Sequence, residues 1–128
     1  MIADLEAAFL RACPSFATDL GRMREDYQIM GFELNLATVL DRLGYHLGVS
    51  AEQVPSAEIL QVLKVVERVL LDGGEQQKWA VTHFLMPSLQ SSIRQKGNRT
   101  DALLAHLGPA SAQWWNDLTS NPRASDDW

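Results

Sequence analysis

Residues 56–74 read SAEILQVLKVVERVLLDGG, and this stretch decides the fold class. Its apolar residues recur every three or four positions and cover one side of a helix, whereas polar residues such as Lys64 and Glu67 cover the other. Gly73 and Gly74 end the pattern as a turn, without the neighbouring residues that a phosphate-binding loop requires. The stretch therefore predicts one long amphipathic α-helix that packs on a core.

The chain on the N-terminal side predicts three further helices. An apolar stripe begins at Ile2 and ends before Pro14, and a third helix over 34–47 should end at Gly48 as a glycine cap, with Gly44 weakening it slightly. The helix between them, over 15–30, should end at Gly31 and turn five side chains toward the core: Phe16, Leu20, Met23, Tyr27 and Met30. Ser50 and Gln53 have capping-box spacing and suggest one more short turn.

The chain on the C-terminal side predicts a helix from Glu75 to Leu89 that Pro87 kinks near Leu85 and Met86. A polar loop over 91–99, a short helix over 101–107 and a last helix from Pro109 should follow.

No segment alternates like a strand, so the fold class we expect is all-α. We predict a single-domain helical bundle of about six or seven helices over residues 1–120, followed by a flexible tail over 121–128. Similar segments at 39–43 and 65–69 leave stacked helical pairs as an open variant of this bundle.

Charge and composition narrow the class of partner. The net charge is −5, which disfavours nucleic acid and anionic membranes as partners and favours a basic protein. The first residues are acidic where a signal peptide would carry Lys or Arg, and no apolar stretch approaches membrane-spanning length. We therefore expect a cytoplasmic protein.

The residues that carry chemistry are few and scattered in the sequence. Cys13 is the single cysteine and is expected to be a buried thiol. The histidines at 46, 83 and 106 lack metal-site spacing, and the carboxylates fall on polar helix faces. We therefore predict no enzyme activity, no cofactor and no metal.

Two surface features remain. Adjacent helical residues point about 100° apart, so Trp114 and Trp115 should divide between the core and the surface. The basic residues Arg94, Lys96 and Arg99 lack interleaved aromatics and are expected to form a solvated loop.

The second half of the chain resembles a family of small bacterial α-helical proteins of the polymorphic-toxin immunity type. The resemblance rests on residues 67–74, 80–85 and 107–111, the last reading Leu-Gly-Pro-Ala-Ser before Trp114-Trp115. In the family an acidic residue tends to follow the Phe-Leu pair, whereas this chain has Met86 and Pro87.

The resemblance implies an immunity protein that binds and neutralises a cognate toxin in the cytosol. For such a role we expect the toxin to contact exposed residues of the acidic front half: Glu25, Asp26, Glu33 and Asp41, with Tyr45 as an aromatic anchor. A non-catalytic helical adaptor or scaffold in a bacterial regulatory complex is the alternative, and the oligomeric state is left open.

Overall fold

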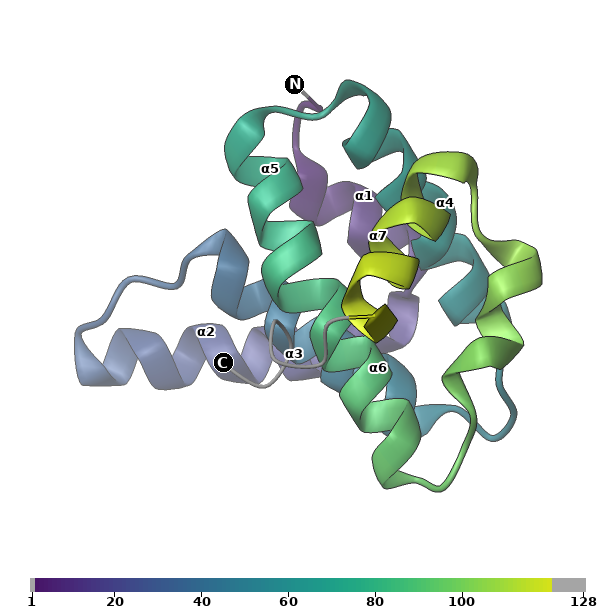
Figure 1. The fold of residues 1–128 in the computed structure, drawn as a ribbon. Helices are drawn as coiled ribbons and strands as arrows, with labels where there is room; N and C mark the ends of the chain where they lie inside the picture. Colours follow the sequence, from purple (N-terminus) through teal and green to yellow (C-terminus); the bar gives the residue numbers. More distant parts are fainter. Residues whose placement is uncertain (1, 121–128) are drawn as a thin grey trace.

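The computed structural model describes residues 2–120 and is an all-α bundle, as the sequence predicts (Figure 1). The described residues contain no strand and form seven α-helices: α1 (Leu5–Ala12), α2 (Ala17–Met30), α3 (Leu36–Ser50), α4 (Ala57–Asp72), α5 (Glu75–Ala80), α6 (Met86–Gln95) and α7 (Pro109–Ser120). Short 3-10 helices, η1 (Pro14–Phe16) and η3 (Thr100–His106), and a π-helix, η2 (Val81–Leu85), join them. The predicted tail over 121–128 lies outside the described residues.

The helix pair with the most extensive contact is α3 with α6. A Cβ atom added to Gly44 would lie 2.6 Å from the Leu85 carbonyl oxygen, and one added to Gly48 would lie 1.8 Å from the Ser92 hydroxyl. Both glycines therefore lie inside the helix, where the two backbones approach each other closely. The prediction that Gly48 caps the helix is wrong, because α3 continues to Ser50 and uses this glycine for packing.

Polar side chains of α6 tie it to the backbone of α3 along the whole contact. Ser88 and Ser92 donate to the carbonyls of Asp41 and Gly44 at 2.7 and 3.0 Å. Lys96 donates to two carbonyls at the C-terminal end of α3, at 2.9 and 3.0 Å. The predicted polar loop over 91–99 is thus mostly helix, and Lys96 caps α3 instead of being only solvated.

The segment between α3 and α4 contains no helical turn, so the turn predicted over 50–53 is absent. Instead the Ser50 hydroxyl donates back to the His46 carbonyl at 2.6 Å, and Ser56 is the residue that caps α4. A serine at the end of one helix has a helical carbonyl within reach, which competes with capping the next helix.

The helix α4 contacts α1, α5 and α7. Trp115 is 1% exposed and Trp114 is 40% exposed, so the prediction that this pair divides between core and surface is confirmed. Cys13 is also buried, as predicted.

Pro87 lies just after a change in helical hydrogen bonding, and the helix does not stop there. Residues 81–85 form the π-helix η2, in which the Met86 N–H donates to the Val81 carbonyl, five residues back. Because proline has no N–H and crowds the preceding turn, a wider turn keeps the chain helical through the predicted kink site.

The helix α2 projects from the rest of the bundle together with the start of α3 (Figure 1). Its first part is anchored by the buried Leu20 and by an ion pair between Arg24 and Glu6 of α1. Of the predicted apolar stripe, Phe16 and Leu20 are buried and Met23 packs against the core, whereas Met30 is exposed because α2 has left the core by its last turn. None of the described helices is both long and apolar enough to cross a membrane.

Candidate functional site

All five residues predicted to bind a partner are exposed, and they lie on α2, on α3 and in the connection between them. Glu25 and Asp26 lie on α2, Glu33 lies in the connection after it, and Asp41 and Tyr45 lie on α3. The structure brings Asp26 and Asp41 to the rim of one hollow of about 320 Å³ between α2 and α3. Residues that are 15 positions apart in the sequence therefore share one surface.

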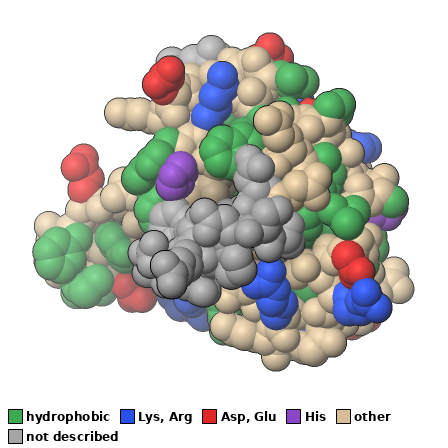
Figure 2. All heavy atoms as spheres, viewed as in Figure 1, with side chains coloured by type: hydrophobic (Ala, Val, Ile, Leu, Met, Phe, Trp, Pro, Cys, Tyr) green, Lys and Arg blue, Asp and Glu red, His purple; other side chains and the backbone are tan. Residues whose placement is uncertain are grey.

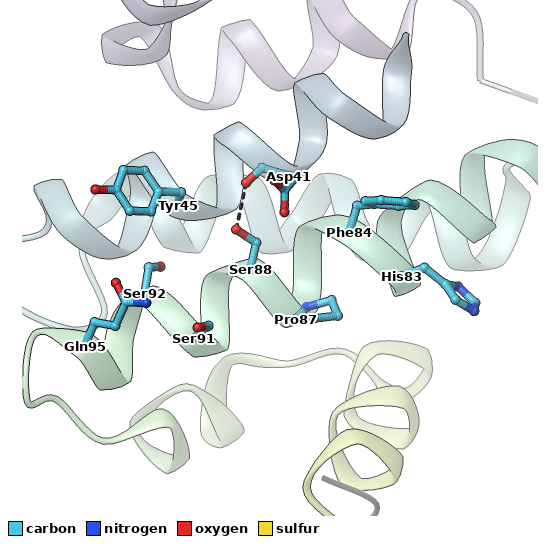
Figure 3. A pocket seen from close by; sticks show the side chains of 9 residues that line it. All are labelled: Asp41, Tyr45, His83, Phe84, Pro87, Ser88, Ser91, Ser92 and Gln95. Atoms are coloured by element: carbon cyan, nitrogen blue, oxygen red, sulfur yellow. Dashed lines mark hydrogen bonds between the residues drawn. The ribbon is translucent and has the colours of Figure 1, made fainter. Parts of the chain in front are cut away.

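A second hollow, of about 280 Å³, lies between α3 and the η2–α6 segment and includes Asp41 and Tyr45 (Figure 3). Partial burial raises the pKa of the Asp41 carboxyl above its ordinary value of 3.8, although the Ser88 hydroxyl and the charge of Arg42 lower it. The guanidinium of Arg42 lies 5.4 Å from the centre of the Tyr45 ring and holds it by a cation–π contact. Asp41 thus joins the two hollows.

A third hollow, of about 580 Å³, is bordered by the start of α3 and by Trp79, and it shares Phe84 with the second hollow. Trp79 contacts Phe84 edge-on at 5.0 Å and stacks on His83 at 5.7 Å between ring centres. Each pair of hollows shares one residue: Asp41 borders the first and second, Phe84 the second and third, and Thr38 the first and third. The three hollows therefore form one continuous surface around α3, which we call the α3 face.

Sequence reasoning missed an apolar group at the end of this face. Ile29, Met30 and Phe32, here called the apolar tip, are 84%, 55% and 66% exposed. Figure 2 shows hydrophobic side chains gathered at the free end of the projecting helices. The signal was present, because Ile29 and Phe32 lie outside the helical stripe and flank a glycine turn, where a core position is improbable.

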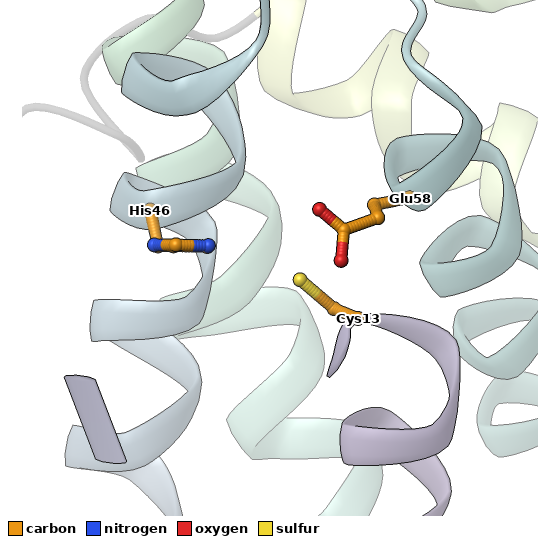
Figure 4. Close-up of side chains that lie close together, drawn as sticks. All are labelled: Cys13, His46 and Glu58. Atoms are coloured by element: carbon orange, nitrogen blue, oxygen red, sulfur yellow. The ribbon is translucent and has the colours of Figure 1, made fainter. Parts of the chain in front are cut away.

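Five polar side chains meet at a separate place, where α1, α2, α3 and α4 approach one another. The polar cluster consists of Cys13, Ser15, Asp19, His46 and Glu58 (Figure 4 draws three of them). The Ser15 hydroxyl oxygen lies 2.8 Å from His46 Nε2, 2.7 Å from a Glu58 carboxylate oxygen and 3.7 Å from the Cys13 sulfur. His46 Nδ1 lies 3.1 Å from Asp19 Oδ2, so the ring connects Asp19 to Ser15, and Ser15 connects the ring to Glu58.

The cluster changes the pKa values of two of its members in opposite ways. Burial raises the pKa of the Cys13 thiol to about 11, so the thiol is neutral. Burial also acts to raise the pKa of Glu58, but hydrogen bonds from the hydroxyl and N–H of Ser15 more than offset it and hold that pKa below 4.5. Glu58 is therefore a carboxylate at neutral pH.

Ser15, His46 and Asp19 follow the order of a nucleophile, a base and an orienting carboxylate. Glu58, however, accepts from both the hydroxyl and the backbone N–H of Ser15, so neither group is free to meet a substrate. Because the Ser15 hydroxyl donates its only proton to Glu58, the geometry favours a structural or ligand-binding use of this cluster.

Comparison with known proteins returned no relative: no family model, curated protein or solved structure matches this chain. The immunity-type resemblance therefore stays a prediction, and the function has to be argued from the surface itself.

Proposed function

We propose that this chain is a protein-binding module that uses the α3 face and the apolar tip, and that its partner is a basic bacterial toxin which it neutralises. The observation that carries the proposal is the exposure of Ile29, Met30 and Phe32 together at one projecting end. Large apolar side chains gathered on a surface cost solubility unless a partner covers them, and such groups are the usual centres of protein interfaces.

The charge around the apolar tip supports a basic partner. Residues 25–41 contain four acidic side chains, Glu25, Asp26, Glu33 and Asp41, and no lysine, arginine or histidine. Acidic groups around an apolar centre attract a basic surface and raise the rate of association, whereas the buried centre determines how slowly the complex dissociates.

The aromatic residues of the α3 face favour a broad contact with the partner instead of a contact through one anchor residue. Tyr45 borders the hollow that contains Asp41 and is 43% exposed, and Trp79 borders the adjoining hollow and is 49% exposed. Half-exposed aromatics bind with little loss of side-chain entropy and are common in interface cores. The same surface would serve an adaptor, so the proposals differ only in the nature of the partner.

The test is to co-express this chain with the product of the neighbouring gene and to measure both the rescue of growth and the recovery of a complex. The immunity proposal predicts that the neighbouring product is toxic alone and that the wild-type chain restores growth. Phe32→Ala should weaken the complex by about tenfold or more, because truncating a central apolar contact typically costs over 1 kcal/mol. The double change Glu25→Lys and Glu33→Lys should slow association most at low salt.

The matched control is Leu71→Ala, since Leu71 is 62% exposed but lies on α4, away from the projecting helices. It should leave binding unchanged. If the apolar-tip and charge variants bind with unchanged affinity, this surface is not the interface. If the chain binds a neighbouring product that is not toxic, the chain is an adaptor.

A further inference from the structure

Three side chains of the polar cluster offer the ligand atoms that zinc prefers. The sulfur of Cys13, a nitrogen of His46 and a carboxylate oxygen of Glu58 all lie within 4.8 Å of one another (Figure 4). Tetrahedral zinc with thiolate, imidazole and carboxylate ligands places these atoms about 3.5 Å apart. The three residues come from different helical segments, so only the tertiary fold assembles this set.

The orientation of His46 gives independent support for a metal site. Its Nδ1 atom lies 3.1 Å from Asp19 Oδ2, which fixes the ring and turns Nε2 toward Cys13 and Glu58. Histidines that bind zinc usually donate their other ring N–H to a carboxylate in this way. Asp19 is therefore placed as the orienting partner of a metal ligand.

The Ser15 hydroxyl lies among the three ligand atoms. Its oxygen is within 3.7 Å of the Cys13 sulfur and is hydrogen-bonded to both His46 and Glu58. This hydroxyl holds the ligands together, and because Ser15 is exposed, its side chain can yield that position to an ion that arrives from solvent.

We propose that Cys13, His46 and Glu58 bind one Zn²⁺ ion, with Asp19 orienting His46. Among the common biological cations the thiolate and imidazole select zinc over magnesium or calcium, which prefer oxygen ligands alone. Binding displaces the proton of the Cys13 thiol and requires His46 Nε2 to be without a proton, because zinc binds a thiolate and the lone pair of an imidazole nitrogen. The fourth ligand is water, and the inference does not depend on the identity of any protein partner.

The test uses Co²⁺ as a spectroscopic substitute for Zn²⁺ on the full chain after treatment with a chelator. The expected result is a thiolate-to-cobalt absorption band that saturates at one ion per chain and is abolished by adding Zn²⁺, together with a rise in Tm on Zn²⁺ binding. A folded wild-type chain that gives no thiolate band would overturn the proposal without any need for a variant.

Variants separate the built site from a thiol that binds metal by chance. Cys13→Ser should remove the band, Glu58→Gln should weaken affinity, and Asp19→Asn should weaken it by about 10-fold to 100-fold, as loss of an orienting carboxylate does elsewhere. His106→Ala is the control, because His106 is exposed on η3 and should change nothing. Unchanged affinity in folded Glu58→Gln and His46→Ala proteins would mean adventitious binding and would refute the site.

Discussion

The carboxylate of Glu67, on α4, holds the start of α7 in place. It accepts from the N–H groups of Ala110 and Ser111 at 3.1 and 2.8 Å, and from the Ser111 hydroxyl at 2.9 Å. These are among the N–H groups that a helix leaves unpaired at its N-terminus, where a negative charge is also stabilising. One side chain thus performs the capping that a local residue usually supplies.

Glu67→Gln and Gly108→Ala should destabilise the protein by about 1–2 kcal/mol each, because both disrupt this contact. In Glu67→Gln, the side-chain NH₂ group would face the N–H and O–H donors at the start of α7. In Gly108→Ala, the added Cβ atom would lie 2.4 Å from the Glu67 carboxyl carbon. Urea unfolding of both single variants and the double variant checks this. The double variant should lose less than the sum of the two single losses, and strict additivity would contradict the shared contact.

The matched control for Glu67 is Glu52→Gln, which changes an exposed carboxylate between α3 and α4. A loss of stability in this control as large as in Glu67→Gln would point to general charge effects and not to capping of α7.

The Leu-Gly-Pro-Ala-Ser sequence could be interpreted only as a helix stop followed by a helix start. That reading is correct for residues 107–111, where α7 begins at Pro109. The partner of the motif lies 44 residues from Ser111, and no local spacing indicates it. Sequence predictions for single residues therefore succeed where the local helix pattern determines the position, as with Trp115. They fail where a side chain far along the chain determines it, as Glu67 does at the start of α7.

The contact between α3 and α6 depends on residues without side-chain bulk. Gly48→Ala should destabilise the protein by about 1–3 kcal/mol, as is typical of overpacking, even though alanine favours a helix. The added Cβ would lie 2.5 Å from the Ser92 Cβ, an atom fixed by the α6 backbone, so the helices must separate. Thermal and urea unfolding measure this change.

Gly21 supplies the control for this glycine, because no atom lies within 4 Å of a Cβ added there and it also lies inside a helix, α2. Gly21→Ala should stabilise the protein by about 0.5–1 kcal/mol. Ser92→Gly in the Gly48→Ala background should restore part of the lost stability. Equal effects of the two alanine substitutions would show that helix propensity, not packing, controls both positions.

Periodicity placed most of the helices, but it did not predict which apolar residues pack against another helix. Met30 continues the stripe of Phe16 and Leu20, yet it is 55% exposed because α2 outruns the body that it packs against. The same limit applies to helix ends, since a glycine at position 48 is typical of a helix cap, yet in the structure it lies inside α3 and packs against α6. Which of these roles applies depends on tertiary contacts that override local preference.

The polar cluster joins the first four helices, and it was not predicted, because the hydrogen bonds that link Ser15, Asp19, His46 and Glu58 span 27 to 43 residues along the chain. Charge and helix position did place the acidic residues of the proposed interface on the exposed surface. They could not reveal that α1, α2, α3 and α4 bring a thiol, a hydroxyl, an imidazole and two carboxylates together. The cluster follows from topology, so its contribution should appear as global stability.

Glu58 makes this global stability depend on pH. The groups that face it are Cys13 and Ser15 from the α1–η1 segment and His46 from α3, with Asp19 of α2 behind the imidazole. Because its folded-state pKa lies below 4.5, Glu58 stabilises the fold fully above that value and loses the contribution as pH falls through the folded-state pKa. Asp41, with a raised pKa, acts in the opposite direction, so the two must be separated by mutation.

Glu58→Gln should therefore lower the free energy of unfolding at about pH 7 by about 1–3 kcal/mol, the value of hydrogen bonds to a charged group. The wild-type protein should lose more stability than this variant between about pH 6 and about pH 3, because only the wild type must protonate the carboxylate. Urea unfolding across this range measures both slopes, with Asp41→Asn as the comparison that should steepen the acid loss. Parallel curves for wild type and Glu58→Gln would mean that Glu58 contributes no charge-dependent stability, and that the cluster holds the helices through neutral contacts alone.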